Sequence, residues 1–316
     1  MIQRRAFMKS GAVALFAAGF QGGIPGFLLR AAGAPFAGTQ SGKKKILVCI
    51  FQRGAMDGLM AVTPFADPYL RSLRPGLFMS PAEKEGKIFD LDGQFGMHPA
   101  LESLYPFFTE KRLAVVHGVG SPNNTRSHFD AQDFMESGTP FSKSTTNGWL
   151  NRAVGKLPAA GSPFRAVSVT PALPRCLYGD QESLAIANLQ DFALQVRGNP
   201  LAAKVAAGSF EQLYDATTSE LLNKTARESF DAMKQLREAN MKSYPVTPGV
   251  QYPNSPLANS LKQVATLIKM NIGLEVAFTE SGGWDTHFNQ GTLNGAFARN
   301  LKDFSDSIAE IGRAHV

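Results

Sequence analysis

Residues Ile46-Leu47-Val48-Cys49-Ile50-Phe51 form an uninterrupted apolar run that begins after three lysines and ends shortly before Gly54. An apolar run bounded by charge and glycine is typical of a strand that is buried on both faces of a parallel sheet. Similar runs follow at residues 113–120, 166–169 and 274–278. The sequence therefore predicts four buried strands at these positions.

The segments between these strands have helical patterns. Five helical segments are predicted: residues 99–105, 129–136, 183–243, 255–270 and 291–310. The first is expected to stop before Pro106 and the second at Gly138. Ser255 is placed to cap the fourth, with Pro256 in its first turn. Because strand and helix alternate along the chain, the fold class is α/β with a largely parallel sheet.

Composition and charge exclude several classes of protein. The chain has 316 residues, of which 44% are hydrophobic and 18% charged, and these values exclude a disordered chain, a coiled coil and a collagen-like repeat. Its net charge of +6 comes from residues 1–45, which carry seven basic residues and no acidic one. The remainder holds 25 basic and 26 acidic residues. Because this remainder is nearly neutral, it gives no sign of the basic surface that binds nucleic acid.

The N-terminus has the pattern of an export signal. Arg4 and Arg5, followed by Phe7 and Lys9, match the twin-arginine pattern, whose partner is the twin-arginine translocation machinery. The uncharged run 10–29 contains five glycines and a proline, too broken for a stable transmembrane anchor. We predict that residues 1–37 are removed on export to the periplasm. An ordinary secretory signal or a cytosolic basic tail are the alternatives.

Two cysteines are present, and neither has metal-type spacing. Export would permit a disulfide between Cys49 and Cys176. Because Cys49 lies inside the first apolar run, a buried free thiol is the preferred interpretation. Residues 38–45 are predicted to be a linker between the signal and the folded domain.

Polar side chains follow three of the predicted strands, where ligands of an open α/β sheet bind. They are Arg53 and Asp57 after the first strand, His117 and residues 123–128 after the second, and Glu280, Ser281, Asp285 and His287 after the fourth. This mixture of carboxylate, hydroxyl and imidazole suits divalent metal ions with a hydroxyl nucleophile.

Each candidate also has a simpler interpretation. Asp57, before Gly58, can be a turn residue. Asp285 and His287 lie two residues apart, so in an extended loop both can reach one ion, but a solvated loop explains them as well. Ser127 can be a nucleophile whose anion is stabilised by a helix N-terminus, or only the N-cap. Arg126 can hold an anion or be a surface charge.

Taken in order, five motifs resemble one family, named domain of unknown function 1501, a twin-arginine-exported branch of the alkaline phosphatase and sulfatase superfamily. The motifs are Arg53-Gly54-Ala55-Met56-Asp57-Gly58-Leu59, His98-Pro99-Ala100-Leu101, Arg126-Ser127-His128-Phe129, Gly148-Trp149-Leu150-Asn151-Arg152 and Gly283-Trp284-Asp285-Thr286-His287. The resemblance implies an alkaline-phosphatase-like three-layer sandwich over residues 46–310, with a helical insertion at about 183–243.

The resemblance also implies roles for individual residues. Divalent metal ions (zinc, manganese, calcium or magnesium, with the choice left open) would be held by Asp57, Asp285 and His287. The nucleophile would be Ser127, with Thr125 as the alternative and Arg126 as a second catalytic group. Arg53 and His128 would bind an anionic ester substrate. No cysteine lies in residues 123–128, so sulfatase-type formylglycine chemistry is not expected.

The sequence departs from this family at its end. Members continue into a further strand with a Ser-Glu-Phe-Gly-Arg motif and later a Gly-Thr-Asp-His-Gly motif, and neither occurs here. Residues 311–316 can be encoded by the start of a common sequencing adapter, so we predict that they are a non-biological tail on an incomplete domain. The chain alone is then expected to be poorly soluble, to bind metal weakly and to hydrolyse no ester. The expected function of the intact protein is phosphate or sulfate ester hydrolysis, and the alternative is a non-catalytic cell-envelope binding or assembly protein.

Overall fold

The computed structural model describes residues 45–82, 86–158, 162–192, 232, 236 and 244–314. The expected signal (1–37), all but the last residue of the linker (38–45) and residues 315–316 lie outside this part of the chain. Most of the expected helical insertion (183–243) does as well. Within the described residues, no helix is both long and apolar enough to cross a membrane.

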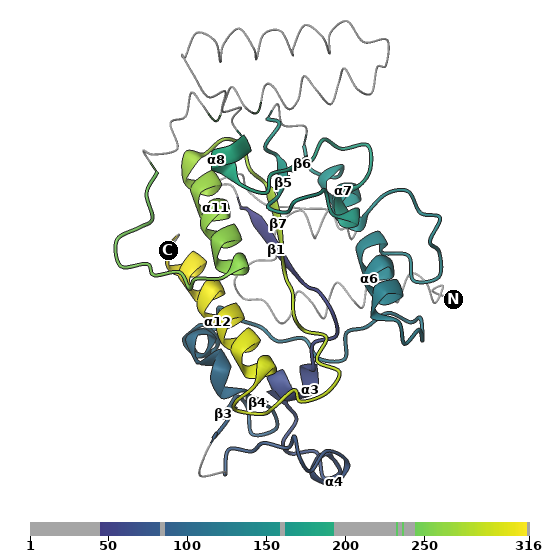
Figure 1. Ribbon diagram of the computed structural model, residues 1–316, viewed down its shortest axis with the longest axis vertical. Helices are drawn as coiled ribbons and strands as arrows, with labels where there is room; N and C mark the ends of the chain where they lie inside the picture. Colours follow the sequence, from purple (N-terminus) through teal and green to yellow (C-terminus); the bar gives the residue numbers. More distant parts are fainter. Residues whose placement is uncertain are drawn as a thin grey trace, which may run out of the picture.

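A four-stranded sheet lies at the centre of the molecule (Figure 1). Its strands are all parallel and lie in the order β1, β7, β5, β6, with bounds Leu47–Gln52, Val276–Ser281, Ala166–Ser168 and Leu184–Ala185. The predicted α/β class with a parallel sheet is therefore confirmed. Three of the four predicted strands form, within two or three residues of the expected bounds.

The second predicted strand is wrong. Residues 113–120 form neither strand nor helix, and Val116 and Val119 are 60% and 70% exposed. The fourth strand of the sheet is instead β6, from a region expected to be helical. As a result β1 lies at the edge of the sheet, and its six residues are partly exposed rather than buried on both faces.

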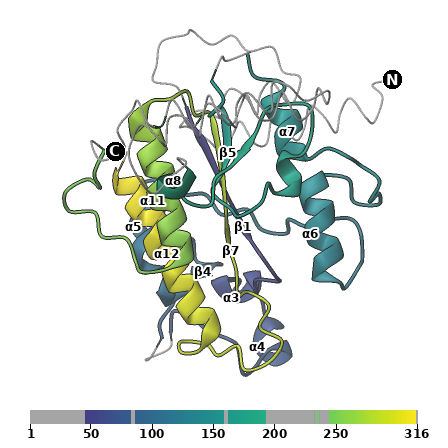
Figure 2. The same cartoon turned by 45° about the horizontal axis from the view of Figure 1, so that its top comes forward.

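Helices cover the sheet on both sides. Figure 2 shows α11 and α12 on one side and α6 and α7 on the other. Their bounds are Pro256–Met270, Ala296–Ala314, His128–Ser137 and Trp149–Val154. Buried apolar residues of α11 pack against β5 and β7, and those of α7 pack against the opposite face of the sheet.

The local signals for two helices are confirmed. The Ser255 hydroxyl accepts a hydrogen bond from the Ala258 backbone N–H at 3.1 Å and so caps α11. Gly138 ends α6 in the left-handed conformation, with φ +69°. The last helix begins five residues later than expected and continues through Ala314, and Ile311 packs against the core.

The helix predicted at 99–105 differs in its end. Residues Pro99–Leu104 form a 3₁₀ helix, η1, which leads directly into α5 at Tyr105–Thr109. Pro106 therefore does not stop the helix but lies in the first turn of α5, where its missing N–H leaves no bond unmade. Both elements precede the segment 113–120.

A small antiparallel sheet and the two short helices that follow β1 lie at the end of the molecule near the carboxyl ends of β1 and β7 (Figure 1), and other short helices lie elsewhere. A three-stranded antiparallel sheet has the order β2, β4, β3, with bounds Val62–Thr63, Gly96–Met97 and Phe89–Asp90. Short helices occur at α3 (Gly58–Ala61), α4 (Leu70–Leu73), η2 (Arg175–Leu177) and α8 (Leu189–Phe192). Of these elements only α8 falls within a predicted helical segment, residues 183–243, and the sequence patterns did not predict the others.

Both cysteines are free thiols, as preferred from the sequence. Burial raises the pKa of Cys49 to about 12. Burial also raises the pKa of Cys176, with the nearby carboxylate of Glu136 adding to the effect. Both thiols therefore stay protonated at neutral pH and are poor nucleophiles.

Candidate functional site

The loops that follow β1 and β7 meet at the carboxyl edge of the sheet. Gly54, after β1, has φ +108°, and a Cβ atom built there would lie 2.7 Å from the Asp285 backbone nitrogen. This close approach, in a conformation that side-chain-bearing residues rarely adopt, explains why glycine occupies the position. It places Asp285 directly beside the end of the first strand.

One carboxylate lies between two imidazoles at this edge. The Asp285 Oδ2 atom is 3.0 Å from His287 Nε2 and 3.5 Å from His128 Nε2. The two histidine rings lie 6.4 Å apart between their centroids. The side chain of His287 is 71% exposed, whereas that of His128 is only 22% exposed. We call His128, Asp285 and His287 the carboxylate–imidazole cluster.

Trp284 holds the loop that carries Asp285. Its side chain is fully buried, and its indole N–H donates to the Ser281 hydroxyl at 3.1 Å. The ring makes edge contacts with Phe297 and Phe304 of α12. The residue before Trp284 is also held, because the Asn300 amide donates to the Gly283 carbonyl at 2.6 Å. The residue before the cluster is therefore part of the core.

Ser127 precedes His128 and is the N-cap of α6. Its hydroxyl accepts from the Asp130 N–H at 3.3 Å, and its own N–H donates to the Thr125 hydroxyl at 3.2 Å. Ser127 is thus the cap that the simpler interpretation expected, although its hydroxyl proton is still available for donation. Arg126 is exposed and makes no hydrogen bond or ion pair with any residue that the structure describes.

Asp57 forms hydrogen bonds with residues outside the carboxylate–imidazole cluster. Both of its oxygens accept from the Arg74 guanidinium, and Gln290 Nε2 donates to Oδ2 at 2.9 Å. Burial raises the pKa of Asp57, but hydrogen bonds from Arg74 and Gln290 and the charge of Arg74 outweigh it, so the pKa lies below its ordinary value. Gln290 also accepts from Thr286, which links this pair to the loop of the cluster.

The predicted metal ligands are therefore only partly brought together. Asp285 and His287 are in contact, whereas Asp57 faces Arg74. Over the described part of the chain, no three His, Cys, Asp or Glu side chains are arranged to hold one metal ion. We expected Asp57, Ser127, Asp285 and His287 to converge at one edge of the sheet. The segments that carry them meet at the carboxyl edge, but the four side chains are not all in contact with one another.

Arg53 is held inside the protein. Its Nε donates to Glu280 at 2.8 Å, its Nη1 pairs with Glu136, and the guanidinium lies over the Phe51 ring. Burial lowers the pKa of Arg53, but its bonds to Glu136 and Glu280 outweigh burial and raise it overall. These contacts occupy Nε and Nη1, so among the described contacts only Nη2 is left for an anionic substrate.

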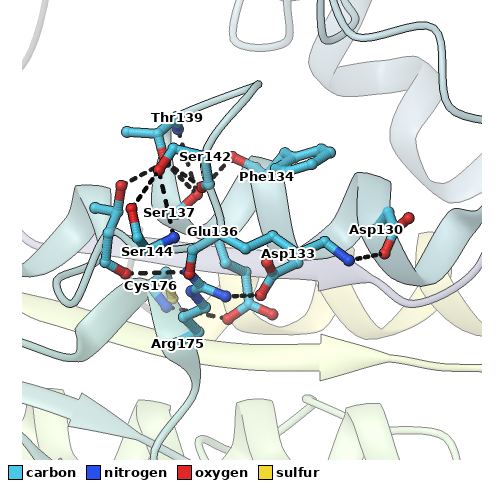
Figure 3. Close-up of polar contacts among 12 residues, drawn as sticks. Asp130, Asp133, Phe134, Glu136, Ser137, Thr139, Ser142, Ser144, Arg175 and Cys176 are labelled. Carbon is cyan, nitrogen blue, oxygen red and sulfur yellow. Dashed lines mark hydrogen bonds and ion pairs between the residues drawn. The ribbon is translucent and has the colours of Figure 1, made fainter.

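Glu136 connects Arg53 to a network on the far side of α6. Figure 3 shows Asp133 and Glu136 turned toward Arg175 and Cys176. The Cys176 backbone N–H donates to Glu136 at 3.0 Å, and Arg175 pairs with Asp133. The network fixes α6, and with it His128, against the segment 175–177.

Sequence reasoning missed the residues that engage the candidates. Arg74 and Gln290 flank Asp57, and Glu136 pairs with Arg53. Each is far from its partner along the chain, and no local pattern marks it. Only the Thr286–Gln290 contact, four residues apart, lies within reach of a local argument.

No family model matches the chain, and neither the curated proteins nor the solved structures contain a match.

Replacing Gly54 with alanine is expected to destabilise the protein by about 2 kcal/mol, because the positive φ and the contact with Asp285 both disfavour a Cβ. Gly58→Ala is the matched control, since a Cβ there meets nothing within 4 Å. Urea unfolding measures both variants. Equal stabilities would show that the two loops do not meet as described.

Replacing Arg74 with methionine is expected to destabilise the protein at neutral pH by about 2 kcal/mol, since Asp57 then keeps a half-buried charge without its partner. The pKa of Asp57 is lowered in the folded state, so its contribution is present above the unfolded pKa of about 4 and is lost as the pH falls through the folded pKa. The difference from wild type should therefore shrink in urea titrations below about pH 4. Lys156→Met, at an exposed lysine, is the control. A difference that stays constant down to pH 2.5 would contradict the role of Asp57.

Proposed function

We propose that the carboxylate–imidazole cluster is the reacting centre of an exported, metal-dependent hydrolase-like protein that cleaves phosphate or sulfate esters. The observation that carries the proposal is the position of Asp285 between two imidazoles at the carboxyl edge of a parallel sheet, where ligands of open α/β sheets bind. The proposal includes the alkaline-phosphatase-like form of the fold and membership of the family of domain of unknown function 1501.

The residues of the cluster have the donor chemistry for a divalent ion. Asp285 would supply oxygen and His287 nitrogen, a combination that suits zinc or manganese, whereas calcium or magnesium would rely on oxygen ligands. Asp57 joins them only if its carboxylate leaves Arg74. When bound, a divalent ion supplies polarisation of the ester oxygen and a lowered pKa for a coordinated hydroxyl or water.

The chain's own residues would act on the ester from two sides. The Ser127 hydroxyl, at the N-terminus of α6, is the nucleophile, and Thr125 is its alternative. An anion that develops there faces the free N–H groups of the helix. The Arg126 guanidinium, which pairs with none of the described residues, is available for the anionic group of the ester. His128, oriented by Asp285, can hold or accept a proton beside Ser127.

One observation favours a second function, that of a non-catalytic binding or assembly protein of the cell envelope. Asp57 and Arg53, two of the expected site residues, are both neutralised by internal partners. A fold that kept its sheet but lost catalysis could use these groups for stability alone.

Metal analysis combined with ester assays distinguishes the two. The purified chain is equilibrated with zinc, manganese, calcium or magnesium, bound ions are counted, and nitrophenyl phosphate and nitrophenyl sulfate are assayed separately. The same measurements are made on a chain extended through the two motifs named above. A bound ion with turnover of either ester in the extended chain supports the hydrolase. An extended chain that is folded but takes up no ion and turns over neither ester supports the binding protein.

Export is proposed from the twin-arginine pattern at the N-terminus. Changing Arg4 and Arg5 together to lysine should leave the precursor in the cytoplasm, as measured by cell fractionation. Unchanged delivery to the periplasm would exclude the twin-arginine route.

A further inference from the structure

Exposed phenylalanines are concentrated beside the carboxylate–imidazole cluster. Of the phenylalanines whose exposure the structure describes, three are exposed: Phe129 (74%), Phe141 (73%) and Phe288 (81%). Two of them directly follow the histidines of the cluster, Phe129 after His128 and Phe288 after His287. A solvated phenyl ring forgoes the burial that usually stabilises it. Single exposed apolar residues are common on protein surfaces, but two large rings beside one cluster indicate an apolar ligand.

The aromatic rings lie in a row along the cluster. The Phe129 ring lies 4.1 Å from the His128 ring, tilted by 36°. The His128 ring lies 6.4 Å from that of His287, and Phe288 is the next residue of the chain. Aromatic rings attract one another at centroid separations of about 4.5–7 Å. A ligand ring placed beside Asp285 would therefore lie within reach of this row.

A third exposed apolar side chain lies beside the loop that follows β7. In this loop, Gln290 Nε2 is 2.9 Å from Asp57 Oδ2 and 3.1 Å from Met60 Sδ. The loop therefore packs on α3, where Leu59 is 51% exposed. Three segments that meet at the carboxyl edge of the sheet thus each present an exposed apolar side chain. We call these side chains the apolar rim: Leu59, Phe129 and Phe288.

Arg126 supplies a cation next to the apolar rim. It lies three residues before Phe129, is exposed, and pairs with none of the described residues. By contrast, Arg53 and Arg74 bind carboxylates of the protein itself. Small-molecule sites commonly combine apolar and aromatic side chains with a few polar groups that fix the orientation of the ligand. The ligand that matches both features has an anionic group joined to an apolar ring.

We propose that the site takes aryl esters, in which the phosphate or sulfate group binds Arg126 and the aromatic ring of the alcohol part rests on the apolar rim. The identity of the anionic group rests on the proposed function, and the aromatic ring is the new element. Hydrolysis of such an ester breaks the bond between the phosphorus or sulfur atom and the phenolic oxygen. The hydroxyl of water goes to phosphorus or sulfur, and its remaining proton goes to the phenol.

Equilibrium binding, measured by isothermal titration calorimetry on the purified chain, tests the proposal. The probes are phenyl phosphate with methyl phosphate, and phenyl sulfate with methyl sulfate. In at least one pair, the phenyl ester should bind at least about fivefold more tightly than the methyl ester, the effect expected of ring contacts. Phe129→Ala and Phe288→Ala should each reduce this preference, and the double variant should abolish it. Equal binding within both pairs, or no binding of any of the four esters, would overturn the proposal.

Tyr178→Ala is the matched control. Tyr178 is an aromatic residue that is 47% exposed, and it follows the segment whose backbone binds Glu136. Glu136 lies about 12 Å along α6 from His128, at the helical rise of about 1.5 Å per residue. The control should leave the preference for the phenyl ester unchanged, and an equal loss in Tyr178→Ala would overturn the proposal. Sedimentation of the same variants excludes another occupant, because rim variants that change the oligomeric state but keep the preference would assign the rim to a contact between copies of the chain.

Binding and turnover together separate the aryl site from the hydrolase. A preference for phenyl esters without turnover of nitrophenyl esters by the extended chain would contradict the hydrolase and keep the aryl site. Turnover by the extended chain without a preference for phenyl esters would contradict the aryl site and keep the hydrolase.

Discussion

Trp284→Ala is expected to destabilise the protein by about 3–5 kcal/mol, the range for truncating a buried tryptophan. The side chain is fully buried between Phe297 and Phe304, and its loss leaves a cavity under the loop that carries Asp285. The Ser281 hydroxyl also loses its donor. Urea unfolding followed by circular dichroism measures the effect.

The other tryptophan supplies the control. The sequence has two tryptophans, and Trp149 is only partly buried at the start of α7. Trp149→Ala should cost less than Trp284→Ala and should leave the Asp285 loop in place. Trp284→Phe should recover part of the stability, because it restores most of the volume but not the hydrogen bond. Similar losses for both alanine variants would contradict the anchoring role of Trp284.

Asp285→Asn is expected to weaken binding of zinc by about 100-fold, since it removes the charged oxygen ligand while keeping the shape of the side chain. Folding should change little, because Asp285 is more than one-third exposed. Isothermal titration calorimetry with zinc measures the zinc affinity of the 316-residue chain and of the variant.

Asp180→Asn is the matched control, at an exposed aspartate in the loop before β6. It removes the same charge from the chain without touching the cluster. If both variants bind zinc as tightly as wild type, the ion is held by residues other than Asp285.

The sequence was sufficient for the parts of the fold that are marked locally. Continuous apolar runs correctly placed β1, β5 and β7. The cap at Ser255 and the glycine at 138 marked the ends of two helices. Each of these features depends on residues that are neighbours along the chain.

Pairing between segments that are distant along the chain could not be predicted from the sequence in the same way. Residues 113–120 have strand composition, but a strand forms only where a partner edge accepts it, and composition does not identify that edge. β6 has two residues, too few for any periodic pattern. The sequence patterns therefore predicted a strand at 113–120 that does not form, and they missed β6.

In the candidate site, too, contacts between near neighbours in the sequence were predictable and contacts between distant segments were not. The contact between Asp285 and His287 follows from their spacing of two residues. The pairing of Asp57 with Arg74 and of Arg53 with Glu136 arises from packing between separate segments, so two expected site residues proved to have internal partners.

Zinc titration of the protein with ¹⁵N-labelled histidines tests the central claim most directly. Four of the five histidines lie in the described residues, and each has a distinct environment. Burial lowers the pKa of His98, whose ring accepts from the Ala100 N–H, and His117 stacks on Phe95. These two are internal controls away from the cluster.

If the cluster is the reacting centre, the imidazole signals of His287 and His128 change together as zinc is added, because both contact Asp285. The signals of His98 and His117 stay where they are. Zinc that shifts His98 or His117 first, or that leaves His128 and His287 unchanged at saturation, would contradict the account.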